Sequence, residues 1–384
     1  MKKLLVVSDP PAAPGYLPRV RFLCEYLVQK GVDVTLLTEE YSDLAFAHSY
    51  PIETIRMYNG TTFDWFIKTV WTLFTDWHNR AFARKYLTAK RSNSDNGLSA
   101  KRSVSEAVFD AVLCSAFSDF PLGAAQRIAQ ALNVPLYCDI RDLDEQVEDS
   151  TYQYHHRTWW TMPFRRLYRA VHIRRRNKVL RAAKAITTVS PWHAEFIKAV
   201  SGVRPESAVS VVYNGYDAAQ FYPQDIPAKQ FIISYIGSLF EWQQAGLNKV
   251  RQAIDESGLP IQLELHTPTH NPLAHNTLGD AIRRSSILLV LTNERTHGML
   301  TTKFYEALGC EKPVLCVPSD KGSLAELIAY TNAGIATDDI EVIKAFIRER
   351  YEEWQQNGFT RQATQHRETF AREAQYDQYY RTHL

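Results

Sequence analysis

The sequence predicts an α/β protein with two domains, each built on a parallel β-sheet. Its 384 residues are long for one domain and comfortable for two. Continuous apolar runs, such as residues 287–291, suit strands that are buried on both faces, as in parallel sheets. Segments with apolar residues at helical spacing alternate with these runs, and this alternation is the pattern of βαβ units.

The composition is that of an ordinary globular protein, with 45% hydrophobic and 22% charged residues. A net charge of +2 gives no global argument for a nucleic-acid partner, and we expect none. The five cysteines form no C-x-x-C pair, which predicts reduced, mostly buried thiols in a cytoplasmic protein. No apolar stretch approaches the ~20 residues of a spanning helix, and the apolar start is too short for a signal peptide.

The chain opens with a predicted strand over residues 3–8, a helix that ends near Lys30 and a strand over 32–38. The loop between the first strand and the helix contains one glycine, Gly15. Taken alone, this glycine is as compatible with an ordinary turn as with the close approach of a ligand.

Residues 63–87 have helical spacing and are rich in aromatic side chains. One interpretation is a helix that faces the core. The other is an interfacial helix near a lipid acceptor, because tryptophan favours the depth of lipid headgroups. Residues 90–102 are polar and without periodicity, and we expect an exposed loop there.

The main charge anomaly spans residues 164–184, which hold nine basic residues and no acid. A basic segment with aromatic neighbours can be a solvated helix face, a nucleic-acid site or a surface for anionic lipid headgroups. Each cation near an anionic membrane contributes on the order of 1 kcal/mol, so half of them would hold a peripheral protein. The candidate membrane-binding residues are Arg165, Arg166, Arg169, Arg174, Arg175 and Arg176.

Charged residues follow the predicted strand over residues 135–139. Polar groups just past a buried strand mark the lip of a ligand cleft, which makes Arg141 and Asp142 candidates for the site. The pair Asp142 and Asp144 also fits a metal-binding D-x-D motif, and surface carboxylates in salt bridges are the third possibility.

The most informative stretch spans residues 285–318. Its apolar run predicts a strand, Thr301 and Thr302 a helix N-cap, and Gly309 the end of that helix. The N-terminus of such a helix carries a partial positive charge and suits a phosphate. Lys303 adds a cation, and Glu306, one turn further on, can accept hydrogen bonds from a ribose diol.

This stretch resembles the donor-nucleotide motif of retaining glycosyltransferases with the GT-B fold, glycosyltransferase family 4 in particular. The family pattern is two glutamates separated by seven residues; Glu306 matches the second, and Gly298 occupies the place of the first. The turn Asn214-Gly-Tyr-Asp217 matches a family signature at the end of the N-terminal domain. The family's basic pair after the glycine turn of the second domain is missing, so Lys303 or the backbone of Gly237 and Ser238 takes over its task.

The resemblance implies two Rossmann-like domains, residues 1–220 and 221–365, that face each other across a cleft, and a terminal helix, 366–384, that returns to the first domain. It implies transfer of a hexosyl group from a nucleoside diphosphate sugar to a hydroxyl with retention, without metal or cofactor. In this scheme Glu306 binds the ribose, and Lys303 and the amides of Thr301 and Thr302 bind the diphosphate. Gly15 allows close approach of the donor. The candidate catalytic residues are Asp142 and Arg141, which line the acceptor side, and Asp119 elsewhere in the cleft.

The expected partners are a nucleotide sugar, a glycan or lipid-linked acceptor and an anionic membrane surface. These partners place the protein in the cytoplasm, peripheral on the inner face of the cell membrane, in surface polysaccharide or glycolipid assembly. Two alternatives remain: a nucleotide-sugar epimerase of the same fold, and a catalytically degenerate subunit that binds nucleotide sugars. The missing glutamate at Gly298 motivates the second alternative.

Overall fold

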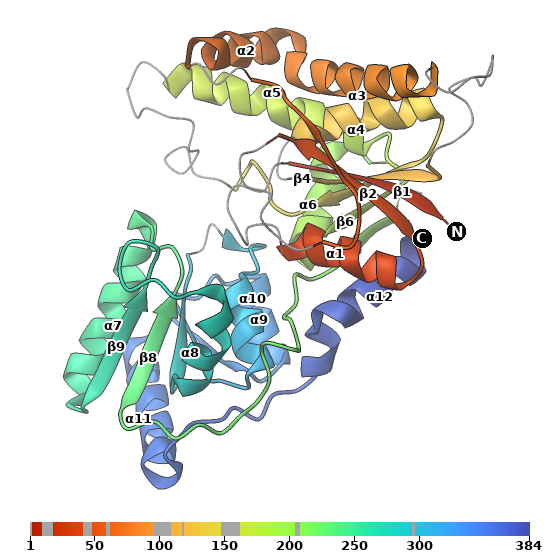
Figure 1. Ribbon diagram of the computed structural model, residues 1–384. Helices are drawn as coiled ribbons and strands as arrows, with labels where there is room; N and C mark the ends of the chain where they lie inside the picture. The colour runs from red at the N-terminus through yellow and green to blue at the C-terminus, as the bar shows by residue number, and fades with distance from the viewer. Residues whose placement is uncertain are drawn as a thin grey trace. The chain divides into compact units, whose positions relative to one another are not determined.

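The protein divides into two compact units, each with one parallel sheet (Figure 1). The first unit holds residues 1–189, 193–211 and 383, and the second holds 190–192, 212–382 and 384. The structure, a computed structural model, describes residues 2–9, 18–40, 48–58, 62–95, 109–116, 119–146, 162–203, 208–293 and 296–384. Gly15 therefore lies outside the described residues.

The sheet of the first unit has seven strands in the order β3-β2-β1-β4-β5-β6-β7, all paired in parallel. Because the order reverses between β1 and β4, the carboxyl ends of these two strands flank a switch point, where open α/β sheets bind ligands. The strands are β1 (Lys3–Ser8), β2 (Asp33–Glu39), β3 (Ile52–Ile55), β4 (Ala111–Ala116), β5 (Leu136–Ile140), β6 (Ala185–Thr188) and β7 (Ala208–Val211).

In the described part of the first unit six helices accompany this sheet. Figure 1 shows α2 to α5 gathered on one of its faces. Within this group α4 packs on β4, while α3 and α5 pack on α4. The helices are α1 (Pro18–Gln29), α2 (Thr62–Thr75), α3 (Trp77–Asp95), α4 (Asp119–Leu132), α5 (Met162–Leu180) and α6 (Pro191–Ser201).

The single helix expected over residues 63–87 is wrong, because the chain breaks at Asp76 into α2 and α3. Asp76 has a φ of 57°, and its carboxylate accepts hydrogen bonds from Asn79 Nδ2 at 2.8 Å and Arg127 Nη2 at 2.6 Å. A short polar side chain tolerates this left-handed conformation, and here it caps the start of α3. The loop expected over 90–102 is wrong as far as Asp95, where α3 ends.

The second unit contains a five-stranded parallel sheet in the order β12-β11-β10-β8-β9. Alternate residues of its central strand enter two cores: Leu288 and Val290 pack with α8, α9 and α10, and Leu289 packs with α7 and α11. The strands are β8 (Phe231–Ile236), β9 (Ile261–His266), β10 (Ile287–Leu291), β11 (Val314–Val317) and β12 (Gly334–Ala336). The helices are α7 (Gln244–Ser257), α8 (Leu278–Arg284), α9 (Thr302–Gly309), α10 (Ser323–Tyr330), α11 (Ile340–Asn357) and α12 (Arg372–His383).

Two doubly covered parallel sheets confirm the predicted α/β class, and the unit β10-α9-β11 is the βαβ unit predicted from residues 285–318. All five cysteines are free and buried, as expected. Within the described ranges, no helix is at once long enough and apolar enough to cross a membrane.

Candidate functional site

Gly237 directly follows β8. Its φ of 125° lies in a region that glycine adopts readily and other residues adopt rarely. The Gly237 amide donates a hydrogen bond to the His266 carbonyl at 2.8 Å. A Cβ atom at this position would lie 2.6 Å from Cε and 2.8 Å from Nζ of Lys303. The missing side chain therefore leaves the space in which the Lys303 ammonium group lies.

Lys303 is the second residue of α9, and its side chain extends back from that helix over the end of β8. The Nζ atom is 5.3 Å from the centre of the Tyr235 ring, within the range of a cation–π interaction. Burial lowers the pKa of Lys303, and Glu306 opposes that shift. The Thr301 hydroxyl caps α9 by accepting from the Lys303 amide at 3.3 Å, and Thr302 is exposed at the first helical position.

Glu306 lies one helical turn beyond Lys303 on α9 and is partly buried. Burial raises the pKa of its carboxyl group to about 7, although Lys303 and Arg372 work in the opposite direction. A carboxyl group perturbed in this way beside a partly buried cation is typical of functional sites. Together the two side chains offer a cation and a hydrogen-bond acceptor at the carboxyl edge of the sheet.

The loop after Gly237 is fixed by a buried residue, Gln243, that the sequence did not single out. Its Nε2 donates to the Leu291 carbonyl at 2.9 Å, and its Oε1 accepts from the Phe240 amide at 2.9 Å. Ser238 is exposed, and its carbonyl accepts a hydrogen bond from the Tyr235 hydroxyl. The sequence around it, Phe240-Glu-Trp-Gln-Gln244, carries no pattern that would have revealed this role.

Gly298 is buried in the turn between β10 and α9, next to the Met299 amide, which donates to the Thr296 carbonyl at 2.8 Å. A glycine brings no side chain, so of the two family glutamates this chain has only the one at Glu306.

The turn Asn214–Asp217 packs on the segment before α12, within the second unit. Gly215 has a φ of 64°, and a Cβ there would lie 2.8 Å from the Phe370 carbonyl oxygen. The Tyr216 amide donates to that carbonyl at 3.1 Å, and the Arg372 amide donates to the Tyr216 carbonyl at 2.8 Å. Asn214 Nδ2 donates to the Leu300 carbonyl at 3.4 Å, so this turn also holds the approach to α9.

In the first unit, Arg141 and Asp142 follow β5 as predicted. Arg141 Nη2 donates to both carboxylate oxygens of Asp9, at 2.6 and 2.8 Å, and this ion pair joins the ends of β5 and β1. Burial raises the pKa of the partly buried Asp142, while Arg141 acts to lower it. These three charged residues lie beside the switch point of the sheet.

A buried network beneath these residues was missed by the sequence reasoning. Asp139, within β5, accepts hydrogen bonds from Arg19 Nη2 at 2.7 Å, Ser115 Oγ at 2.8 Å and Thr187 Oγ1 at 2.7 Å. These contacts fix the first turn of α1 to the ends of β4, β5 and β6. An aspartate inside an apolar strand run is the signal that could have found this network, because a buried carboxylate needs partners.

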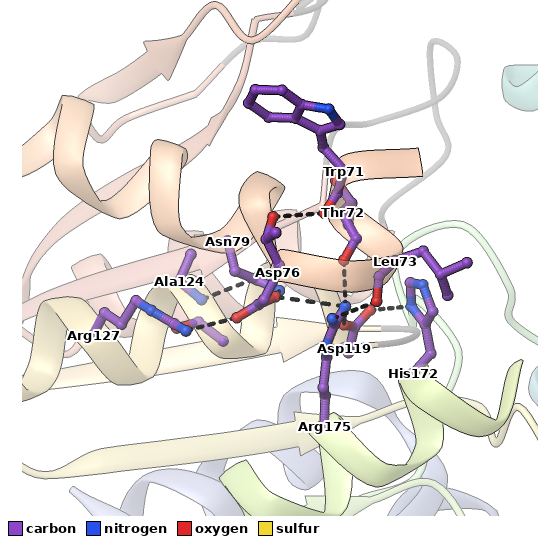
Figure 2. A network of polar contacts seen from close by, with 12 residues as sticks. Trp71, Thr72, Leu73, Asp76, Asn79, Asp119, Ala124, Arg127, His172 and Arg175 are labelled. Atoms are coloured by element: carbon purple, nitrogen blue, oxygen red, sulfur yellow. Dashed lines mark hydrogen bonds and ion pairs between the residues drawn. The ribbon is translucent and has the colours of Figure 1, made fainter. Parts of the chain in front are cut away.

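Asp119 begins α4 and is almost completely buried (Figure 2). Its carboxylate contacts His172 Nδ1 and lies 3.9 Å from Arg175 Nη1, and both partners come from α5. Arg175 also donates to the carbonyls of Thr72 at 2.7 Å and Leu73 at 2.8 Å, near the end of α2. These contacts favour a role for Asp119 in positioning the helices over direct contact with a substrate.

The structure divides the predicted membrane-binding residues between two faces of α5. Arg166 and Arg174 are exposed, whereas Arg176 is fully buried and donates to Glu145 at 2.8 and 2.6 Å. Arg169 Nη2 donates to the Glu145 carbonyl at 2.6 Å. The prediction of membrane binding is thus wrong for the buried Arg176. Arg169 and Arg175 also donate to backbone carbonyls of other elements. The Arg165 side chain lies outside the described residues.

The possible D-x-D pair does not present two carboxylates together. Asp144 is fully buried, 3.9 Å from Arg176 Nη1, while Asp142 is partly exposed. In the part of the chain that the structure describes, no three His, Cys, Asp or Glu side chains gather as a metal-binding group.

The chain is similar to several known glycosyltransferases. The model of the family described as Glycosyltransferase Family 4 matches residues 19–220, which is more than half of the chain. A search of the curated proteins by sequence found no match.

Solved structures resemble the chain over nearly its whole length at low sequence identity, and this likeness concerns the fold. They include sucrose-phosphate synthase from Thermosynechococcus elongatus, with 16% identity, a TM-score of 0.64 and coverage of 99% of this chain and 98% of the other. Anabaena HepE, in complex with UDP and glucose, has 14% identity, a TM-score of 0.61 and coverage of 98% and 95%. The lipopolysaccharide outer core galactosyltransferase WaaB has 11% identity, a TM-score of 0.59 and coverage of 99% and 98%. With the family match and two Rossmann-like parallel sheets, the chain belongs to glycosyltransferase family 4 and is a nucleotide-sugar glycosyltransferase with the GT-B fold.

Proposed function

We propose that the protein transfers a hexosyl group from a nucleoside diphosphate sugar to an acceptor hydroxyl, with retention at the anomeric carbon. The observation that carries this proposal is the position of Lys303 over Gly237, with Glu306 one turn further along α9. A partly buried cation at the carboxyl end of a parallel sheet suits a diphosphate, and the adjacent carboxylate suits a ribose diol.

During transfer the bond between the anomeric carbon and the diphosphate oxygen breaks, and the acceptor oxygen forms the new bond to that carbon. The departing diphosphate takes the electron pair, and the acceptor proton passes to it or to water. Lys303 and the positive end of α9 stabilise the charge that develops on the diphosphate. The backbone of Gly237, Ser238, Thr301 and Thr302 supplies further contacts. Arg141 and Asp142 belong to the acceptor side in this proposal, and Gly15 allows the donor to approach the backbone closely.

The base and the hexose are proposed from the similar structures. HepE is described in complexes with UDP and with UDP-glucose, which makes UDP-hexoses the first donors to test. For the acceptor we propose a glycan or a lipid-linked glycan in surface polysaccharide or glycolipid assembly, with the enzyme peripheral on the cytoplasmic face of the membrane.

The test is a donor screen by thermal shift on the wild type and Glu306→Gln, with UDP, GDP, ADP and their hexoses. A shift with one nucleotide that is reduced in Glu306→Gln supports the donor site. Transfer is then assayed with that donor, and proton NMR of the product reports the anomeric configuration. An inverted product overturns retention, and the absence of any shift overturns the donor site.

A second candidate function rests on Gly298, which leaves the site without the first family glutamate. The protein would then bind nucleotide sugars as an assembly subunit without turning them over. Nucleotide-sugar binding with neither hydrolysis nor transfer would favour this alternative, and measurable transfer would exclude it.

A further inference from the structure

Helix α2 carries an exposed apolar cluster near its C-terminal end. The exposed fraction is 38% for Val70, 57% for Trp71 and 73% for Phe74. Their spacing places the three side chains on one side of the helix. Single exposed apolar residues are ordinary, but an exposed tryptophan, phenylalanine and valine on one helix side mark an interaction surface.

Exposed cations lie on α3 and α5, the two helices that contact α2. On α5, Arg166 and Arg174 are exposed and eight residues apart, so they share the outer side of that helix. Arg80, in the first turn of α3, is exposed as well. Arg84 and Lys85 on α3 and Lys178 on α5 are further exposed cations, and Asp76 is the only acid among the described side chains of residues 62–95 and 166–180.

Two acids beside these helices, Asp76 and Asp119, are held by contacts with neighbouring elements. Asp76 turns inward to Arg127 Nη2 at 2.6 Å, and Asp119 is buried against α5. Arg175, next to Arg174 in the chain, joins α5 to the Thr72 and Leu73 carbonyls in the last turn of α2. Figure 2 shows the Trp71 ring pointing away from this network.

We propose that Trp71, Phe74, Arg80, Arg166 and Arg174 form a docking surface for anionic lipid headgroups. Tryptophan favours headgroup depth, Phe74 and Val70 reach the acyl boundary, and the arginines bind lipid phosphates. Nucleic acid also carries phosphates, but it offers no apolar layer for exposed aliphatic and aromatic side chains. A membrane interface offers both phosphates and an apolar layer. The biological purpose, access to a lipid-linked acceptor, rests on the proposed function, whereas the binding itself needs no nucleotide sugar.

The test is flotation of the full chain with phosphatidylcholine vesicles that contain or lack phosphatidylglycerol. We expect binding to the anionic vesicles that weakens as salt is raised. Each arginine near the surface raises the partition coefficient onto anionic vesicles about fivefold. The triple variant Arg80→Gln, Arg166→Gln, Arg174→Gln should therefore have a partition coefficient roughly a hundredfold lower. The double variant Trp71→Ser, Phe74→Ser should bind at least about tenfold less, because its apolar area is lost.

Two matched variants control for charge and for exposed aromatic area. The charge control is a triple variant in the second unit that removes three exposed arginines from three separate helices: Arg251→Gln, Arg284→Gln, Arg348→Gln. It removes the same charge as the triple variant of the docking surface. Tyr330, as exposed as Trp71 at 57%, is changed to Ser. Both controls should float as the wild type does.

Equal flotation of the docking-surface variants and the controls would overturn the proposal, as would tighter binding of the wild type to an oligonucleotide than to the vesicles. Circular dichroism and thermal unfolding without nucleotide, measured on every variant, establish that each one is folded.

A wild type that binds the vesicles but shows no thermal shift with any nucleotide would count against the transferase proposal alone. A wild type that responds to a nucleotide but does not bind the vesicles would count against the docking surface alone.

Discussion

Lys303 and Gly237 depend on each other although they lie on different elements of the second unit. The lysine side chain occupies the space that any side chain at Gly237 would need, with Cε 2.6 Å from an ideal Cβ position. A cation is thereby held at the carboxyl end of β8, one helical turn along α9 from the Glu306 carboxyl group. This arrangement supports the proposal of a diphosphate site, since the ammonium group is positioned and available for an anion.

The first prediction concerns Gly237→Ala. The new methyl group should displace Lys303 and weaken the binding of a nucleoside diphosphate by at least about tenfold, measured by isothermal titration calorimetry. Gly258→Ala is the matched control, because Gly258 also has a positive φ, 67°, but an added Cβ meets no atom within 4 Å. Equal affinities of the two variants would contradict the prediction.

The second prediction separates the phosphate contact from the base contact. Lys303→Gln should lower the affinity for a nucleoside diphosphate by roughly tenfold to a hundredfold, as expected for one hydrogen bond to a charged group. The affinity for the corresponding nucleoside, which has no phosphate, should not change. The control is Lys229→Gln, at an exposed position outside the site. An equal loss for nucleoside and nucleotide would show that the variant disturbs the fold and not the phosphate contact.

The third prediction follows from the raised pKa of Glu306, about 7 in the folded protein against about 4.3 in an unfolded chain. The fold favours the protonated carboxyl group, so this group's contribution to stability is complete below pH about 4.3 and is lost as the pH rises through about 7. Glu306→Gln should therefore raise the free energy of unfolding at pH 8 by about 1–2 kcal/mol, and by little at pH 5. Urea unfolding at both pH values checks this, with the exposed Glu373→Gln as control.

The fourth prediction concerns the buried pair of Asp139 and Arg19. Burial acts to raise the pKa of Asp139, but Arg19 and the hydroxyls of Thr187 and Ser115 outweigh it and hold the pKa below its usual value. Asp139→Asn leaves Arg19 buried without its counter-charge and should cost about 3–5 kcal/mol of unfolding free energy at pH 7. Asp255→Asn, at an exposed site, should cost almost nothing.

Acid sensitivity gives an independent check on the same pair. A lowered pKa contributes stability above the unfolded value, about 3.9, and that stability is lost as the pH falls further. The wild type should therefore lose more stability than Asp139→Asn below pH about 4. If the free energy of unfolding falls equally in the two proteins as the pH is lowered below about 4, the charge of Asp139 contributes nothing to stability.

The sequence predicted the β10-α9-β11 unit because its signals are local. An apolar strand run, a threonine N-cap and a glycine at the helix end lie within 34 residues, and each acts on its immediate neighbours. Lys303 and Glu306 follow directly from this unit, since they occupy the first two turns of its helix.

The partners of these residues are set by tertiary structure and were out of reach. Nothing local connects Gly237 to Lys303, or Gln243 to the carbonyl of Leu291. On α5 the helical period alone does not sort the arginines, because Arg166 and Arg169 are three residues apart, yet Arg166 is exposed and Arg169 donates to the Glu145 carbonyl. Which arginines face inward depends on Glu145, which accepts from Arg176 and lies on a different element.

The most direct test of the account is hydrogen–deuterium exchange of the full chain with and without a UDP-hexose. We predict slower exchange of the backbone amides in 237–243 and 300–307, because a bound diphosphate and ribose would cover the end of β8 and the first turns of α9. Glu306→Gln at the same donor concentration should reduce this protection. Protection confined to other segments, or none at a concentration that shifts the melting temperature, would contradict the assignment of the donor site to this edge of the sheet.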